Sequence, residues 1–205
     1  MHIAKNSALI VIDVQKGFDL APVWGRRNNP DAERNIAALC EMWQATGRPV
    51  VCVRHTTDRV LSPFATWSPG RGLKPEVVQV RFNVTVEKSV NSSFLGTPDL
   101  HEWLRQHQIR QIVVVGIQTN MCVESTARTG GNLGYDVVVP LDATHTFDLK
   151  VDGRTFTADE LAQATAANLA GGRFATVTST KELLGGFIPV TGETSGRQEE
   201  IAGVL

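Results

Sequence analysis

Short apolar runs alternate with segments of helical period along most of the chain. The apolar runs are rich in β-branched and aliphatic residues, which is typical of strands buried on both faces of a sheet. They cover residues 8–12, 49–53, 84–86, 112–116, 137–139 and 174–177. The helical segments cover residues 29–47, 97–104, 122–133, 157–169 and 180–184. This alternation predicts an α/β fold, a three-layer α-β-α sandwich with a six-stranded, mostly parallel, Rossmann-like sheet.

Three of the helical segments begin with recognisable capping residues. Asn29-Pro30-Asp31 predicts an N-cap at Asn29, with the proline at the first helical position. Thr97-Pro98-Asp99 predicts the start of the next helix, and Thr157 to Glu160 fits a capping box. These signals predict where each connection between strands turns into a helix.

Two segments have no helical or strand period. Residues 56–74 contain several prolines and glycines and predict a long loop, which in a compact domain is usually functional or mobile. Residues 191–205 begin with a polar stretch rich in Gly, Thr and Ser, so we expect a tail that is disordered or lies in a subunit contact. With no repeat or linker visible, a single domain is expected over residues 1–190.

The composition narrows the classes of partner. Lys and Arg number 20 and Asp and Glu number 21, so the formal net charge is −1. With no basic block, this balance argues against nucleic acid or an anionic membrane surface as the main partner. No apolar run approaches the roughly 18 residues of a spanning helix, and no secretory signal is visible. We therefore expect a cytoplasmic protein.

Three cysteines occur at wide spacing and without a Cys-x-x-Cys pair, which favours neither a zinc site nor a redox dithiol. Cys40 on an apolar helix face and Cys52 in mid-strand are expected to be inert core residues. Cys122 follows the fourth apolar run after a short polar turn and begins the next helix. A helix N-terminus lowers the pKa of a thiol, and its free N–H groups can bind an oxyanion, so Cys122 is a candidate nucleophile.

Asp13 and Lys88 follow other apolar runs, at the sheet edge where ligands bind in parallel α/β folds. A partly desolvated carboxylate at Asp13 would bind a proton more readily than one in water. Lysine at position 88 could hold a carboxylate in place or stabilise developing negative charge. Taken alone, a turn-capping aspartate and a solvated lysine are the commoner roles at such positions, so these alternatives stay open.

Three ordered motifs resemble those of the isochorismatase-like cysteine hydrolases, and the likeness runs from about residue 8 to residue 184. The motifs are Leu9-Ile10-Val11-Ile12-Asp13-Val14-Gln15, Val86-Glu87-Lys88 with Ser93-Phe94 downstream, and Val115-Gly116-x-x-Thr119-x-x-Cys122-Val123 with Thr126-Ala127-Arg128. The resemblance implies a catalytic triad of Asp13, Lys88 and Cys122 on a parallel six-stranded sheet. It also implies a homodimer or homotetramer.

The same resemblance implies a reaction. A cis peptide bond is expected at about Ile117–Gln118, directing the N–H of Gln118, beside that of Cys122, toward an oxyanion. Cys122 would attack a carbonyl carbon, with Asp13 as acid and base and Lys88 positioning the pair and stabilising charge. This predicts hydrolysis of an amide, ureido or lactam C–N bond in a small molecule. Ester hydrolysis, isochorismatase-type cleavage, and a binding module that keeps the fold are the alternatives.

The region after the second strand bears on metal binding and on the pocket. Family members that resemble nicotinamidase carry Asp-x-His with a later His there, as a metal site. This chain has only His55 and Asp58 in that region, an incomplete ligand set, so we expect no metal and no other cofactor. His55 is instead a candidate pocket residue. The other candidate pocket residues lie beyond the strand ends: Phe18, Trp67, Ser93, Phe94 and His145.

Overall fold

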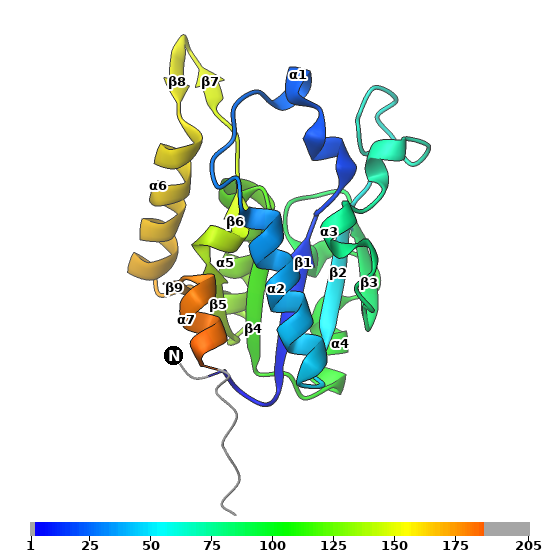
Figure 1. Cartoon of the computed structure of the whole chain (residues 1–205), viewed down its shortest axis with the longest axis vertical. Helices are drawn as coiled ribbons and strands as arrows, with labels where there is room; N and C mark the ends of the chain where they lie inside the picture. Colours follow the sequence, from blue (N-terminus) through cyan, green and yellow to red (C-terminus); the bar gives the residue numbers. More distant parts are fainter. Residues whose placement is uncertain (1–2, 187–205) are drawn as a thin grey trace, which may run out of the picture.

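The computed structural model describes residues 3–186 and has a central sheet of parallel strands (Figure 1). Six strands lie in the order β3-β2-β1-β4-β5-β9, and the short strand β6 (Thr144–His145) pairs with β4. In chain order the six are β1 (Ser7–Ile12), β2 (Val50–His55), β3 (Val84–Lys88), β4 (Gln111–Ile117), β5 (Asp136–Pro140) and β9 (Thr176–Thr178). The predicted α/β fold and its six parallel strands are confirmed, whereas the predicted tail at 191–205 lies outside the described residues.

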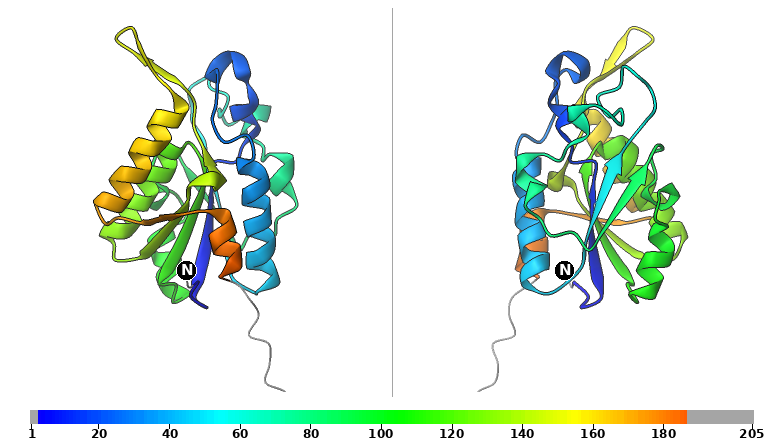
Figure 2. Two further views of the ribbon diagram at one scale, coloured as in Figure 1. Left: turned by 60° about the vertical axis from the view of Figure 1, so that its left-hand side comes forward. Right: turned by 90° about the vertical axis from the view of Figure 1, so that its right-hand side faces the viewer.

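Helices cover both faces of the sheet, which Figure 2 shows nearly edge-on. Successive residues of β1 point to opposite faces, so Leu9 and Val11 belong to one core and Ile10 and Ile12 to the other. The first core is covered by α2 (Ala32–Ala45), α3 (Pro75–Val78) and α7 (Thr180–Gly185), and the second by α4 (Leu100–Gln106), α5 (Glu124–Asn132) and α6 (Ala158–Gly171). Each fully buried aliphatic side chain contributes about 1.5–3 kcal/mol, so the sheet is a firm support for its edge. No helix within residues 3–186 is long and apolar enough to cross a membrane.

Two helices begin as their sequence signals predict. At the start of α4, Oδ1 of Asp99 accepts a hydrogen bond from the N–H of Glu102 at 3.0 Å. At the start of α6, Thr157 and Glu160 form both halves of a capping box. Each cap satisfies backbone N–H groups that the first helical turn leaves without partners.

Helix α2 begins two residues later than the sequence predicts, after Asp31. Asn29 has a left-handed backbone with φ of 43° and does not cap the helix. Its Nδ2 instead donates hydrogen bonds to the carbonyl oxygens of Leu141 at 3.0 Å and Thr144 at 2.7 Å. The predicted N-cap at Asn29 is wrong because this side chain connects the segment before α2 to the segment after β5.

A hairpin absent from the sequence prediction projects from the same end of the molecule as the short helix α1 (Ala21–Trp24) (Figures 1 and 2). Its strands, β7 (Leu149–Val151) and β8 (Arg154–Phe156), pair antiparallel around Asp152-Gly153. Both turn residues have positive φ, 49° and 78°. Asp-Gly is a strong signal for such a turn, but strands of three residues are too short to show an alternating pattern.

The strand order changes direction between β1 and β4, because β2 and β3 extend the sheet on one side and β5 and β9 on the other. In open α/β sheets, ligands bind beyond the carboxyl ends of the strands at such a switch point. The register sets Ile12 of β1 beside Gly116 of β4, and His55 of β2 beside Lys88 of β3. The residues at these strand ends are therefore neighbours along one edge.

Candidate active site

Three buried polar side chains meet at this carboxyl edge of the sheet. Asp13 follows β1, Lys88 ends β3, and Cys122 lies in one turn of π-helix (Thr119–Val123) between β4 and α5. The chain turns out of β1 at Asp13, whose φ is 53° and whose N–H donates to the carbonyl oxygen of Val53 at 2.9 Å. The strand ends and the π-turn thus bring side chains from three distant segments to one place.

Gly116 allows β4 to run close beside the end of β1. Its φ is 126°, and a Cβ at this position would lie 2.0 Å from the carbonyl oxygen of Ile12. Among the amino acids only glycine tolerates this backbone and this approach. Gly116 therefore sets the spacing between the segment that carries Asp13 and the turn that carries Cys122.

Lys88 lies between the other two side chains. Its Nζ is 2.6 Å from Oδ2 of Asp13 and 3.3 Å from Sγ of Cys122. Sγ also lies 3.9 Å from Oδ1 of Asn91. Asp13, Lys88 and Cys122 are 0%, 2% and 7% exposed, so water screens their interactions little. Oδ1 of Asp13 is buried and has no hydrogen-bond partner in the described part of the chain, which leaves it able to accept a proton.

The Cys122 thiol is protonated at neutral pH. Burial raises its pKa to about 12, the Asp13 carboxylate adds to the rise, and Lys88 opposes it. The prediction that a helix N-terminus lowers this pKa is therefore wrong. Cys122 lies in the π-turn before α5 begins, buried beside a carboxylate, and these surroundings disfavour the thiolate. Attack by this sulfur needs a base to take its proton.

Lys88 stays charged beside Asp13. Burial alone would lower the pKa of Lys88, but the negative charge of Asp13 and the hydrogen bond to it raise it, and the net shift is upward. The close contact with Asp13 offsets the desolvation of both charges. Cys40 and Cys52 are also buried, and burial raises the pKa of each thiol to about 12. Their placement fits the prediction of core thiols.

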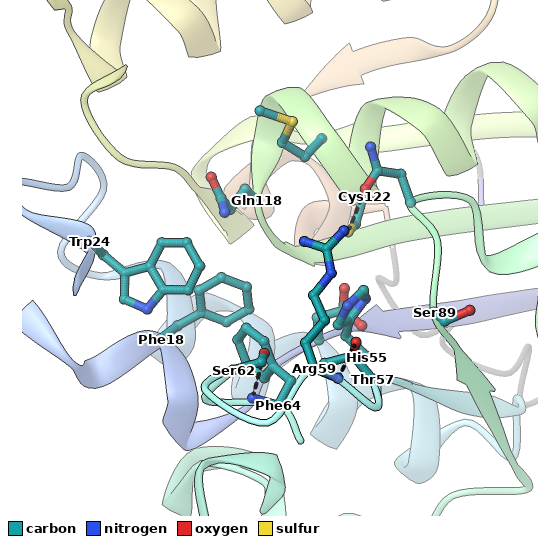
Figure 3. Close-up of a pocket in the computed structure, with 13 residues that line it drawn as sticks. Phe18, Trp24, His55, Thr57, Arg59, Ser62, Phe64, Ser89, Gln118 and Cys122 are labelled. Atoms are coloured by element: carbon teal, nitrogen blue, oxygen red, sulfur yellow. Dashed lines mark hydrogen bonds between the residues drawn. The ribbon is translucent and has the colours of Figure 1, made fainter. Parts of the chain in front are cut away.

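A cavity of about 360 Å³ opens beside Cys122 (Figure 3). Phe18, Trp24 and Phe64 form an aromatic wall, in which the ring centroid of Phe18 lies 4.9 Å from that of Trp24 and 4.7 Å from that of Phe64. Figure 3 shows Phe18 and Trp24 on one side of the cavity and Cys122 on the other. The other lining residues are Asp13, His55, Thr57, Arg59, Ser62, Ser89, Asn91, Gln118 and Met121. The volume is at the small end of the range for pockets that bind small molecules.

Of the predicted pocket residues, Phe18 and His55 line this cavity. Burial and the nearby charge of Lys88 lower the pKa of His55, so the ring is neutral at pH 7. Buried Gln15 fixes the backbone there: its Oε1 accepts the His55 N–H at 2.8 Å, and its Nε2 donates to the His55 carbonyl at 3.1 Å. His55 is thus an uncharged, well-supported part of the cavity wall.

Trp67, Ser93 and Phe94 lie outside the lining of the cavity, contrary to the prediction. Trp67 is 67% exposed, because the loop turns at Ser62 and directs Phe64 inward instead. Ser93 and Phe94 lie in a short 3-10 turn (Ser93–Leu95) beyond β3. The N–H of Ser93 donates to Oγ1 of Thr126 in α5 at 3.0 Å, and the ring of Phe94 packs in the core. This turn therefore fastens the loop after Lys88 to α5.

His145 also lies outside the cavity lining, buried within a cluster of charged side chains. Its Nε2 is 3.2 Å from Oε1 of Glu33. The Glu33 carboxylate accepts two hydrogen bonds from Arg27 at 2.7 Å and one from Nζ of Lys74 at 2.7 Å. The His145 ring packs edge-on against Phe147, a neighbour of the aromatic wall. His145 thus supports the wall from behind.

Eight of the lining residues are not among the predicted ones, and Trp24 and Arg59 are two of the eight. Nε1 of Trp24 donates to the carbonyl of Gly17 at 2.7 Å, which fixes the indole beside Phe18. Arg59 lies on the loop after β2. Neither residue directly follows a strand, and their only sequence signal is a large side chain on a segment that leaves the carboxyl edge: Trp24 ends the short helix α1, and Arg59 lies on a loop.

The turn after β4 has an unusual backbone. The peptide bond between Ile117 and Gln118 is cis, at the position that the resemblance names. The use of the N–H groups of Gln118 and Cys122 as oxyanion donors stays a prediction. Within residues 3–186, no group of three or more His, Cys, Asp or Glu side chains is placed to hold a metal ion.

Comparisons with known proteins agree on one family. A family model described as the isochorismatase domain matches residues 7–182. YrdC of Bacillus subtilis strain 168, an uncharacterised isochorismatase family protein, is 37% identical over 188 residues, covering 90% of this chain and 97% of YrdC. Nicotinamidase 3 of Arabidopsis thaliana is 30% identical over 186 residues, covering 82% of this chain and 83% of that protein. A solved isochorismatase-family structure from Chromobacterium violaceum ATCC 12472 matches with a TM-score of 0.84 and 35% identity, covering 91% of this chain and 96% of that one.

Proposed function

Because the chain belongs to the isochorismatase family of hydrolases, we propose that it cleaves a C–N bond of a small molecule with Cys122 as the nucleophile. The observation that carries the proposal is the buried contact of Lys88 with both Asp13 and Cys122, at the wall of a cavity. A nucleophile, a proton acceptor and a cation in contact are the groups that acyl transfer uses. The Arabidopsis relative, named as a nicotinamidase, supports an amide among amide, ureido and lactam substrates.

The first half of the proposed reaction forms a thioester. The sulfur of Cys122 attacks the carbonyl carbon of the substrate while its proton passes to Asp13. The carbonyl oxygen becomes an oxyanion, which the backbone N–H groups of Gln118 and Cys122 stabilise. Asp13 then gives the proton to the leaving nitrogen, the C–N bond breaks, and the amine departs. Because burial and the Asp13 carboxylate raise the pKa of the thiol, the sulfur carries its proton when the substrate binds, and Asp13 accepts that proton for the attack.

The second half hydrolyses the thioester. Asp13 takes a proton from a water molecule as the water oxygen attacks the thioester carbon. The C–S bond breaks, a carboxylic acid is released, and Asp13 returns the proton to the sulfur. Lys88 keeps the carboxylate of Asp13 beside the sulfur in both halves and stabilises its negative charge.

A hydrolysis screen over amides, ureido compounds, lactams and isochorismate tests the proposal. We expect turnover of at least one C–N substrate, and a fall in kcat of about 10³-fold or more in Cys122→Ala and in Asp13→Asn. Cys40→Ala, which removes a core thiol, is the matched control and should keep the wild-type rate. During turnover, intact-mass analysis should detect the acyl group of the substrate on Cys122. Full activity in Cys122→Ala, or cleavage of isochorismate alone, would contradict the proposal.

A further inference from the structure

Arg59 places a positive charge at the cavity. Arg59 lies on the loop after β2 and lines the same cavity as Cys122. Its backbone N–H donates to Oγ1 of Thr57 at 3.3 Å. Figure 3 shows its side chain extending across the cavity, with the guanidinium directed toward Cys122. Within residues 3–186, this guanidinium has no ion-pair partner and no hydrogen bond.

The other cationic side chains near the cavity each contact a carboxylate. Lys88 pairs with Asp13 at 2.6 Å. Arg54 and Arg71 both contact Oε1 of Glu87 at 2.5 Å. His55 adds no charge, because burial and the charge of Lys88 lower its pKa. Arg59 is therefore the cation in the lining of the cavity, and no carboxylate within residues 3–186 contacts it.

The rest of the cavity limits which group could bind the Arg59 guanidinium. The aromatic wall of Phe18, Trp24 and Phe64 favours an apolar, planar group, and about 360 Å³ admits only a small molecule. A guanidinium binds a carboxylate through two parallel hydrogen bonds, a geometry that a neutral group does not match. We propose that Arg59 binds an anionic group, most simply a carboxylate, of a small substrate whose apolar part lies on the aromatic wall. This inference rests on the proposed function, since it names the substrate class of the same site.

Alkylation of Cys122 tests the inference without a substrate. Iodoacetate and iodoacetamide differ in charge and alkylate the same sulfur, so their rate ratio at Cys122, mapped by peptide mass spectrometry at pH 8.5, reports the charge preference of the cavity. We expect the iodoacetate-to-iodoacetamide ratio to fall about fivefold in Arg59→Gln and to be largely restored in Arg59→Lys. Arg81→Gln should leave the ratio unchanged, because Arg81 is exposed and precedes β3 at the end opposite Lys88. Equal ratios in wild type and Arg59→Gln would overturn the inference.

Turnover separates the inference from the proposed function. The probes are 4-carbamoylbenzoate and its neutral methyl ester, both primary amides on a planar ring. If Arg59 binds the carboxylate, the ratio of kcat/KM for the acid to that for the ester should fall about tenfold or more in Arg59→Gln. Turnover of both probes with the same ratio in wild type and Arg59→Gln would overturn the inference and leave the proposed function standing. If no C–N substrate is cleaved, the proposed function fails and the alkylation ratio still decides whether Arg59 attracts anions.

Discussion

The ammonium group of Lys88 contacts both Asp13 and Cys122, but it is closer to Asp13. Nζ of Lys88 is closer to Oδ2 of Asp13, at 2.6 Å, than to Sγ of Cys122, at 3.3 Å. The lysine therefore balances the carboxylate first, and the thiol keeps its proton. In this arrangement Oδ1 of Asp13, which has no hydrogen-bond partner in the described part of the chain, is open to a proton from a nearby group.

His145 makes stability depend on pH at the scale of one residue. Burial lowers its pKa to about 4, from an ordinary value of 6.5, so the folded chain favours the neutral ring. The stability linked to this difference is present above pH 6.5 and is lost as the pH falls toward 4, because the unfolded chain binds the proton first. We expect the free energy of unfolding of the wild type to lose about 2–3 kcal/mol more than that of His145→Gln between pH 7 and pH 4.

Urea denaturation at several pH values measures this difference. His107→Gln is the control, since His107 is an exposed histidine near the end of α4. The control should keep the pH dependence of the wild type. The prediction is wrong if His145→Gln keeps it as well.

At the scale of elements, the close approach of β4 to β1 depends on Gly116. In Gly116→Ala the new methyl group would lie 2.0 Å from the Ile12 carbonyl oxygen, with φ at 126°. We expect the free energy of unfolding to fall by at least about 3 kcal/mol, as seen from the urea midpoint or from loss of soluble protein.

Gly171→Ala is the matched control for this substitution. Gly171 is the last residue of α6, and a Cβ added there meets no atom within 4 Å. Its stability should stay level or rise by up to about 1 kcal/mol, because alanine favours the helix. If both variants were as stable as the wild type, the prediction that the close approach of β4 to β1 requires glycine at position 116 would be wrong.

The sequence predicts the helices and strands better than it predicts which side chains line the cavity. The six strands are predictable because short, continuous, β-branched apolar runs such as Ile112–Val115 are typical of parallel strands buried on both faces. Asp13, Lys88 and Cys122 are candidates because the ends of parallel strands meet at one edge, and the family resemblance joins them into a triad. Trp24 is not predicted because its position depends on tertiary contacts, the hydrogen bond to the Gly17 carbonyl and the packing on Phe18 and Phe147, which no local sequence pattern indicates.

The ionisation of the site also could not be predicted from sequence. A cysteine before a helix resembles a stabilised thiolate, but the pKa of Cys122 depends on burial and on the distance to Asp13. Both are tertiary quantities. His145 illustrates the same limit, because a histidine beyond a strand end can face the cavity or, as here, a buried carboxylate.

At the scale of the whole molecule, one carboxylate joins segments that are far apart in the chain. Glu33 in α2 binds Arg27 before that helix and Lys74 at the end of the long loop, and it lies beside His145 after β5. Lys74 also binds Asp19 at 2.6 Å. The segments that carry the aromatic wall are therefore fastened to α2 through Glu33.

Glu33→Gln should destabilise the protein by about 3–5 kcal/mol, because it leaves buried positive charge without its partner. Glu41→Gln, an exposed position on the same helix, is the control and should change stability by less than about 0.5 kcal/mol. Urea unfolding measures both. Hydrogen exchange should also quicken in the segments around Arg27 and Lys74 in Glu33→Gln alone. Matching stabilities for the two variants would show that the cluster is not a fastening point.

The raised pKa of the Cys122 thiol bears on how the protein survives oxidants. Peroxides attack the thiolate and not the thiol, so a sulfur with a pKa of about 12 forms sulfenic acid slowly at neutral pH. Cys40 and Cys52 are buried with similarly raised pKa values. We therefore expect the burial that raises the pKa of Cys122 to slow oxidation of its sulfur as well.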